Sequence, residues 1–225
     1  MNRRCLMTRS AVAAFCMIAL SAFSTHAADQ PRLTPEQAWR CLKDGNERFA
    51  AGRLEVKDVG PARRKELAAG QHPFAVVLSC ADSRAAPEII FDQGLGEIFV
   101  VRVAGNISEP FALGSIDYAV EHLHVPLIVV LGHEQCGAVA TALTGSKPAG
   151  DLGKLIGEIH VGQCAAADKE ESLAAAVRNN ARRQAELLTE RSDVIREHVK
   201  QKKLQVVAGV YLLASGKVRW LDLGP

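Results

Sequence analysis

The stretch FAVVLSCADSR, residues 74–84, predicts the fold, because it joins a short apolar run to a group of polar side chains. Residues 74–78 are apolar throughout and follow Pro73, which is typical of a strand buried on both faces of a parallel sheet. Three more apolar runs of this kind lie further along the chain, at residues 98–101, 127–131 and 205–212. The sequence therefore predicts about four buried strands.

Helical segments separate these runs. Thr34 and Gln37, with a proline between them, form an N-cap and its capping-box partner, which predicts a helix over about residues 35–49. A further helix is expected at residues 115–124. Between residues 168 and 202 the chain is rich in Ala, Arg, Glu and Leu, which favours one or two amphipathic helices.

The alternation of strands and helices predicts an α/β fold. Parallel strands need crossover connections, which helices supply, so we expect a mainly parallel sheet of about four strands with helices on both faces. A turn at residues 215–217 and a last short apolar run at residues 218–221 add an antiparallel edge strand. The chain has 225 residues, of which 48% are hydrophobic, and this is enough to bury the core of one domain.

Residues 1–27 have the layout of a secretory signal peptide. Basic residues precede an apolar run at residues 11–23, and small or polar residues follow it. We therefore expect a mature domain of residues 28–225 in a periplasmic or secreted location. The pair Arg3 and Arg4 loosely resembles a twin-arginine signal, and ordinary basic charge is the alternative. The apolar run is shorter than the roughly 20 residues of a membrane span, so no span is predicted in the mature protein.

The predicted mature chain is almost neutral. The whole chain carries 27 basic and 25 acidic side chains, and the signal segment contains three of the basic ones and none of the acidic ones. The net charge therefore falls from +2 to −1, which gives no basic footprint for a nucleic-acid partner. Cleavage would leave Cys41, Cys80, Cys136 and Cys164 in a compartment where disulfides can form.

Three of the polar side chains are candidate metal ligands. Cys80 lies just after the first apolar run and His133 just after the third, at the sheet edge where open α/β sheets bind their ligands. Cys136 lies three residues after His133, a spacing that lets both side chains turn toward one point. Two thiolates and one imidazole suit Zn²⁺, and three protein ligands leave the fourth position open for water, as in catalytic sites.

Other arrangements of the cysteines stay open. Cys80 and Cys136 could form a disulfide in an exported protein, although the neighbouring Asp, Arg and His residues favour a metal site. Cys41 and Cys164 fit no motif, and we expect them to be core or surface residues, with a mutual disulfide as the alternative.

The segments CADSR at residues 80–84 and GHEQCG at residues 132–137 resemble the two signature motifs of the β-class carbonic anhydrases. Further similar segments cover most of the predicted mature chain, and their order and spacing make the resemblance specific. It implies an exported bacterial enzyme that hydrates CO2 reversibly to bicarbonate and a proton, through a hydroxide activated by one Zn²⁺ per subunit. It also implies a homodimer or a homotetramer.

The resemblance also assigns roles to individual residues. It makes Cys80, His133 and Cys136 the zinc ligands. Asp82 and Arg84 become the polar pair beside the bound solvent, with Asp82 as a fourth ligand in a closed resting state only. Gln71 and Gly137 are assigned to substrate binding by the same comparison.

Two other functions fit the same motifs. One is a hydrolase of carbonyl sulfide or carbon disulfide on the same fold, since a fold does not determine the substrate. The other is a non-catalytic zinc-binding module, such as a bicarbonate sensor, in which Asp82 closes the site permanently.

Overall fold

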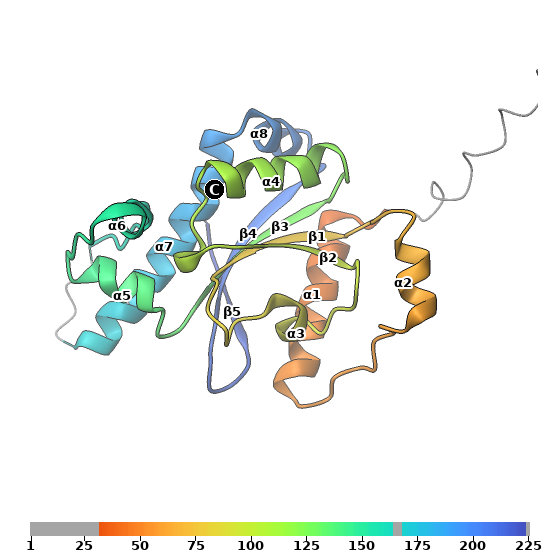
Figure 1. Cartoon of the computed structure of the whole chain (residues 1–225), viewed down its shortest axis with the longest axis horizontal. Helices are drawn as coiled ribbons and strands as arrows, with labels where there is room; N and C mark the ends of the chain where they lie inside the picture. The colour runs from red at the N-terminus through yellow and green to blue at the C-terminus, as the bar shows by residue number, and fades with distance from the viewer. Residues whose placement is uncertain (1–31, 164–167, 224–225) are drawn as a thin grey trace, which may run out of the picture. The chain divides into compact units, whose positions relative to one another are not determined.

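The computed structural model describes residues 32–163 and 168–223. These residues contain a five-stranded sheet with the strand order β2-β1-β3-β4-β5 (Figure 1). The strands are β1 (Ala75–Ser79), β2 (Ile98–Arg102), β3 (Leu127–His133), β4 (Gln205–Tyr211) and β5 (Val218–Leu221). The predicted signal peptide and Cys164 lie outside the described residues.

The pairing of the strands confirms the predicted α/β class. Strands β2, β1, β3 and β4 are parallel to their neighbours, and β5 pairs with β4 in the antiparallel direction. One detail differs from the prediction: β3 continues to His133, because Gly132 and His133 still pair with Val210 and Tyr211 of β4. His133 is therefore the last residue of its strand and does not lie beyond it.

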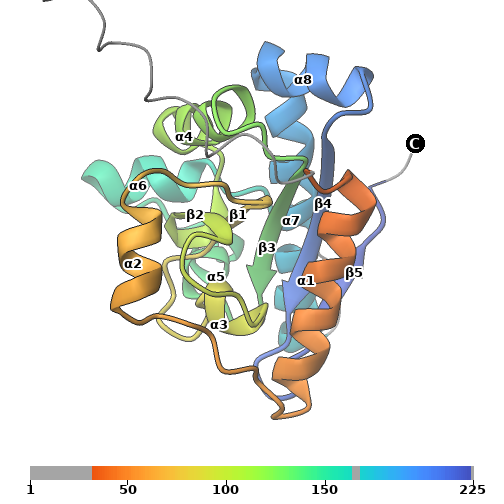
Figure 2. The same ribbon diagram turned by 90° about the vertical axis from the view of Figure 1, so that its right-hand side faces the viewer.

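Helices cover both faces of the sheet, as predicted. Alternate residues of a strand point to opposite faces, and accordingly Val76 and Ile128 belong to one core cluster while Val77 and Val129 belong to another. The first cluster packs under α4 (Pro110–Glu121), α7 (Lys169–Arg191) and α8 (Asp193–Lys200), and the second under α1 (Pro35–Ala50) and α3 (Pro87–Ile90). Figure 2 shows α1 and α7 on opposite sides of β3 and β4.

Some helices depart from the predicted ranges. Helix α4 begins at Pro110, five residues before the predicted start, because the Glu109 side chain caps the amides of Phe111 and Ala112. The region after residue 168 forms two helices, and Ser192, which caps α8, separates them. Four short α-helices of the described residues were not predicted, namely α2 (Pro61–Leu67), α3 (Pro87–Ile90), α5 (Gly137–Leu143) and α6 (Gly150–Gly157).

Helix α1 confirms the predicted capping box, and it also fastens the edge of the sheet. Thr34 and Gln37 exchange the expected hydrogen bonds at its N-terminus. Near its C-terminal end the buried Asn46 donates to the carbonyl groups of Ile90 and Gly216 and accepts from the amide of Val218. A single side chain therefore joins α1, the end of α3 and the β4–β5 hairpin.

Among the described residues, no helix combines the length and the apolar character that crossing a bilayer requires.

Candidate metal centre

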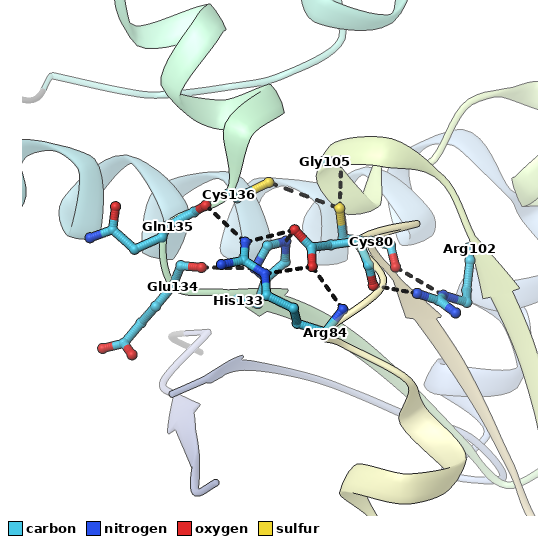
Figure 3. A network of polar contacts seen from close by, with 9 residues as sticks. Cys80, Arg84, Arg102, Gly105, His133, Glu134, Gln135 and Cys136 are labelled. Atoms are coloured by element: carbon cyan, nitrogen blue, oxygen red, sulfur yellow. Dashed lines mark hydrogen bonds and ion pairs between the residues drawn. The ribbon is translucent and has the colours of Figure 1, made fainter. Parts of the chain in front are cut away.

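Three candidate ligands meet at the carboxyl ends of β1 and β3. Cys80 directly follows β1, His133 ends β3, and Cys136 is the N-cap residue of α5. All three side chains are buried, and their ligand atoms lie within 4.8 Å of one another. Figure 3 shows them gathered from separate parts of the chain. The structure therefore brings together the three residues that the sequence placed at one sheet edge.

The imidazole of His133 presents one ring nitrogen to this cluster. Its Nδ1 atom lies 2.8 Å from the carbonyl oxygen of Glu134, so Nδ1 carries the hydrogen and donates it. The Nε2 atom is buried and makes no hydrogen bond with any described residue. A buried lone pair without a partner is costly in free energy, and a bound metal ion would satisfy it.

The two thiols lie side by side without a covalent bond. Their Sγ atoms are 3.9 Å apart, about twice the length of a disulfide bond, and both cysteines are free. Their mutual hydrogen bond lowers the pKa of Cys80, which the amide of Gly105 also stabilises as a thiolate from 3.3 Å. The same contact raises the pKa of Cys136. The contact between the two sulfurs therefore favours a thiolate at Cys80 beside a thiol at Cys136.

The donor set fits a soft divalent cation. It combines two sulfurs, one of them readily ionised, with one unpartnered imidazole nitrogen, and it excludes bulk water. Zn²⁺ prefers sulfur and nitrogen donors of this kind. The cluster can therefore hold a metal ion, with three protein donors.

Asp82 and Arg84 form a tight ion pair beside the cluster. Arg84 donates to both carboxylate oxygens, from Nε at 2.9 Å and from Nη2 at 2.8 Å, and its backbone amide donates as well. These hydrogen bonds hold the pKa of the Asp82 carboxyl well below its usual range. The Oδ2 atom of Asp82 lies 3.8 Å from Nε2 of His133. An ionised acceptor therefore lies next to the candidate metal centre.

Arg102 supports the loop that carries these residues, and sequence reasoning gave it no role. It lies at the end of β2 and donates to the carbonyl oxygens of Cys80, at 3.0 Å, and Asp82, at 2.6 Å. Figure 3 shows it on the Cys80 side of the site. Arg102 directly follows the apolar run at residues 98–101, so the sequence places it at the carboxyl ends of the strands, where Cys80 also lies. That position is the signal that could have revealed its role.

The two predicted substrate-binding residues lie in different places. Gly137 directly follows Cys136 as the first residue of α5, and the space beside its Cα atom is open. Gln71 is exposed and precedes β1, whereas Cys80 follows that strand. A strand of five residues spans about 16 Å, so the described chain does not bring Gln71 to the cluster.

The sequence is similar to those of known carbonic anhydrases. A family model described as carbonic anhydrase matches residues 75–218. A protein of Mycobacterium tuberculosis named carbonic anhydrase 2 is 56% identical over 124 residues, which cover 53% of this chain and 60% of that protein. The match thus spans less than two thirds of that relative. A carbonic anhydrase of Mycolicibacterium smegmatis is 41% identical over 196 residues, covering 84% of this chain and 94% of that protein.

Solved structures show the same similarity. A β-carbonic anhydrase of the fungus Aspergillus fumigatus superposes with a TM-score of 0.67 at 29% identity, covering 73% of this chain and 83% of that one. One of two tetrameric β-carbonic anhydrases of Sordaria macrospora gives a TM-score of 0.65 at 26% identity, covering 72% and 87%. The matched family region includes all three residues of the cluster.

Proposed function

Since this chain belongs to the β-carbonic anhydrase family, we propose that it catalyses the reversible hydration of CO2 to bicarbonate and a proton. The observation that carries the proposal is the buried cluster of Cys80, His133 and Cys136 next to an ionised Asp82. Three donors and an adjacent acceptor are the parts that a metal-assisted hydration needs.

The proposed cofactor is one Zn²⁺ per subunit, bound by Cys80, His133 and Cys136. When bound there, zinc would act as a Lewis acid that makes hydroxide available near neutral pH. The hydrogen bond from Nδ1 of His133 to the Glu134 carbonyl fixes the tautomer and the ring orientation that leave Nε2 free as a ligand.

Asp82 is proposed to orient the attacking hydroxide. An ionised carboxylate can only accept hydrogen bonds, so it holds the hydrogen of the nucleophile toward itself and leaves an oxygen lone pair facing the CO2 carbon. Arg84 keeps Asp82 ionised and fixes its orientation through two side-chain hydrogen bonds. In the closed state that the family resemblance implies, Asp82 would become the fourth ligand only after its ion pair with Arg84 is broken.

The direct test measures zinc content and turnover of the purified protein. We expect about one zinc per chain, CO2 hydration from pH 6 to 9, loss of turnover after chelation, and its recovery on adding Zn²⁺. Carbonyl sulfide and carbon disulfide are assayed in parallel. Full zinc content without CO2 turnover would instead support a non-catalytic module, and faster turnover of either sulfur compound would support the hydrolase.

We further propose that the enzyme assembles as a homodimer or a homotetramer through the β2 edge of its sheet. The Sordaria macrospora relatives are tetrameric. Strand β2 is an outer strand, and its apolar residues Ile98, Phe99, Val100 and Val101 are only half-buried within one chain. A free apolar edge of this kind favours pairing with another chain.

The oligomer prediction is checked by light scattering. We expect a mass of two or four chains, and we expect Val100→Glu on β2 to reduce that mass at least twofold, because pairing would bury the new charge. Arg219→Glu changes an exposed residue of β5, the opposite outer strand, and should leave the mass unchanged. If Arg219→Glu reduced the mass and Val100→Glu did not, the interface would lie at β5 instead. A monomeric parent protein would refute the proposed assembly.

A further inference from the structure

We propose that Asn180, on α7, is a positioning residue for the metal centre and acts on Cys80 through the backbone of Gly105. The inference rests on the metal centre proposed above. The Asn180 side chain is fully buried, and its Nδ2 atom donates to the carbonyl oxygen of Gly105 at 2.8 Å. The amide of the same glycine donates to Sγ of Cys80 at 3.3 Å. Gly105 thus links α7 to a candidate ligand.

Gly105 lies in a turn whose shape needs support. It belongs to the short 3-10 helix η1 (Ala104–Asn106) and has a φ angle of 73°, in the left-handed region that glycine adopts most readily. A Cβ atom at this position would lie 2.7 Å from Cδ1 of Ile159, so the turn is also closely packed. Because a glycine has few conformational limits of its own, the hydrogen bond from Asn180 helps to keep its amide directed at the sulfur.

Helix α7, which carries Asn180, is packed against the sheet, and this packing fixes the position of the Asn180 side chain. It has 23 residues and packs against β3 and β4, the strands at the centre and far side of the parallel sheet. Arg102 holds the carbonyl oxygen of Cys80 from β2. Cys80 is therefore held at two points. Arg102 of the outer strand β2 binds its carbonyl oxygen, and Gly105, which Asn180 of α7 holds in turn, binds its sulfur. Figure 3 shows Gly105 and Arg102 on separate sides of Cys80.

The chemistry of the Asn180 side chain suits this position. Its Nδ2 atom donates to Gly105, while its Oδ1 atom accepts from the backbone amide of His160 at 3.0 Å. A leucine would fill nearly the same volume and bring no charge into this fully buried position, but it could neither donate to Gly105 nor accept from His160. The substitution Asn180→Leu therefore removes the proposed link without leaving a large cavity.

A matched control lies one turn further along α7. Gln184 is also fully buried. Its Oε1 atom accepts from the backbone amide and the hydroxyl of Ser108, and its Nε2 atom donates to the carbonyl of Glu158. Its Nε2 atom also donates to Oδ1 of Asn180 at 3.4 Å, but none of these bonds reaches Gly105 or Cys80, and the bond from Asn180 Nδ2 to Gly105 is left in place when Gln184 is replaced. If the side-chain amides of Asn180 and Gln184 only stabilised the fold, Asn180→Ala and Gln184→Ala would affect metal binding to the same extent.

The test uses the full-length holoprotein and reads metal binding without turnover. Zinc affinity is measured by competition with a chromophoric chelator, and the cobalt-substituted protein is examined for its thiolate-to-metal charge-transfer band. We expect Asn180→Ala and Asn180→Leu to weaken zinc binding roughly 10-fold, as loss of outer hydrogen-bond partners does in other metal sites, and to shift the cobalt band. Gln184→Ala should change the affinity less than about twofold, even where its loss of thermal stability is similar.

The possible results separate this inference from the proposed function. Equal effects of Asn180→Ala and Gln184→Ala, or an unchanged affinity in Asn180→Leu, would overturn the role of Asn180 while leaving the metal centre intact. A parent protein that binds neither zinc nor cobalt would refute the centre itself. If Asn180→Ala does not fold because of the cavity that it leaves, the larger and uncharged side chain of Asn180→Leu still gives the comparison.

Discussion

Replacing Cys80 by serine or His133 by alanine should reduce bound zinc from about one ion per chain to a trace, and should reduce CO2 hydration to the uncatalysed rate. Each substitution leaves two protein donors, and structural or catalytic zinc sites use at least three. The effect should be large because both side chains are buried, so bulk water cannot freely replace the missing donor. Metal analysis after gel filtration, together with stopped-flow CO2 hydration, checks both outcomes.

Cys41→Ser is the matched control for Cys80→Ser. Cys41 is also a free thiol, but it lies on α1, and it is not part of the metal-binding group among the described residues. The control should keep its zinc and its activity, which would show that loss of a thiol alone is harmless. Zinc retained in both Cys80→Ser and His133→Ala would place the metal elsewhere and contradict the proposed ligand set.

Much of this site could be predicted from the sequence because local pattern and topology agree. Continuous apolar runs predicted the parallel strands, and the carboxyl ends of neighbouring parallel strands meet at one edge. Cys80 and His133 each lie close after the end of such a run, so the sequence pattern alone predicts that they are near each other, as they are in the structure. The predicted fold and the predicted donor cluster therefore share one physical cause.

The supporting residues could not be predicted in the same way. Asn180 bonds to Gly105 across 75 positions of the chain, and no periodicity or spacing marks two buried polar groups as partners.

The short helices α2, α5 and α6 were missed because seven or eight residues give too little periodicity to detect. Gln71 was assigned by resemblance alone, and β1 separates it from the cluster.

Asp82→Asn should retain zinc but hydrate CO2 roughly 100-fold more slowly near neutral pH, since misdirecting a reacting group by small distances has effects of this size. Asparagine has almost the same shape, but it is neutral and presents a donor where the carboxylate offered only acceptors. It also gives up the two-pronged ion pair with Arg84. Because the pKa of Asp82 is far below its usual range, the parent carboxylate stays ionised throughout an assay from pH 6 to 9. The lower rate would therefore appear across this whole range.

Asp92→Asn separates this orienting role from the general loss of an ion pair. Asp92 is a buried carboxylate that accepts from Nε of Arg48 at 2.5 Å, beside α1 and the end of α3. Its substitution should lower thermal stability, because the ion pair between the buried carboxylate and the partly exposed Arg48 is lost, yet leave the turnover per zinc close to that of the parent. If Asp82→Asn also kept the parental turnover per zinc, the nucleophile would have to be oriented by another group, and Arg84 would then hold Asp82 only as part of the fold.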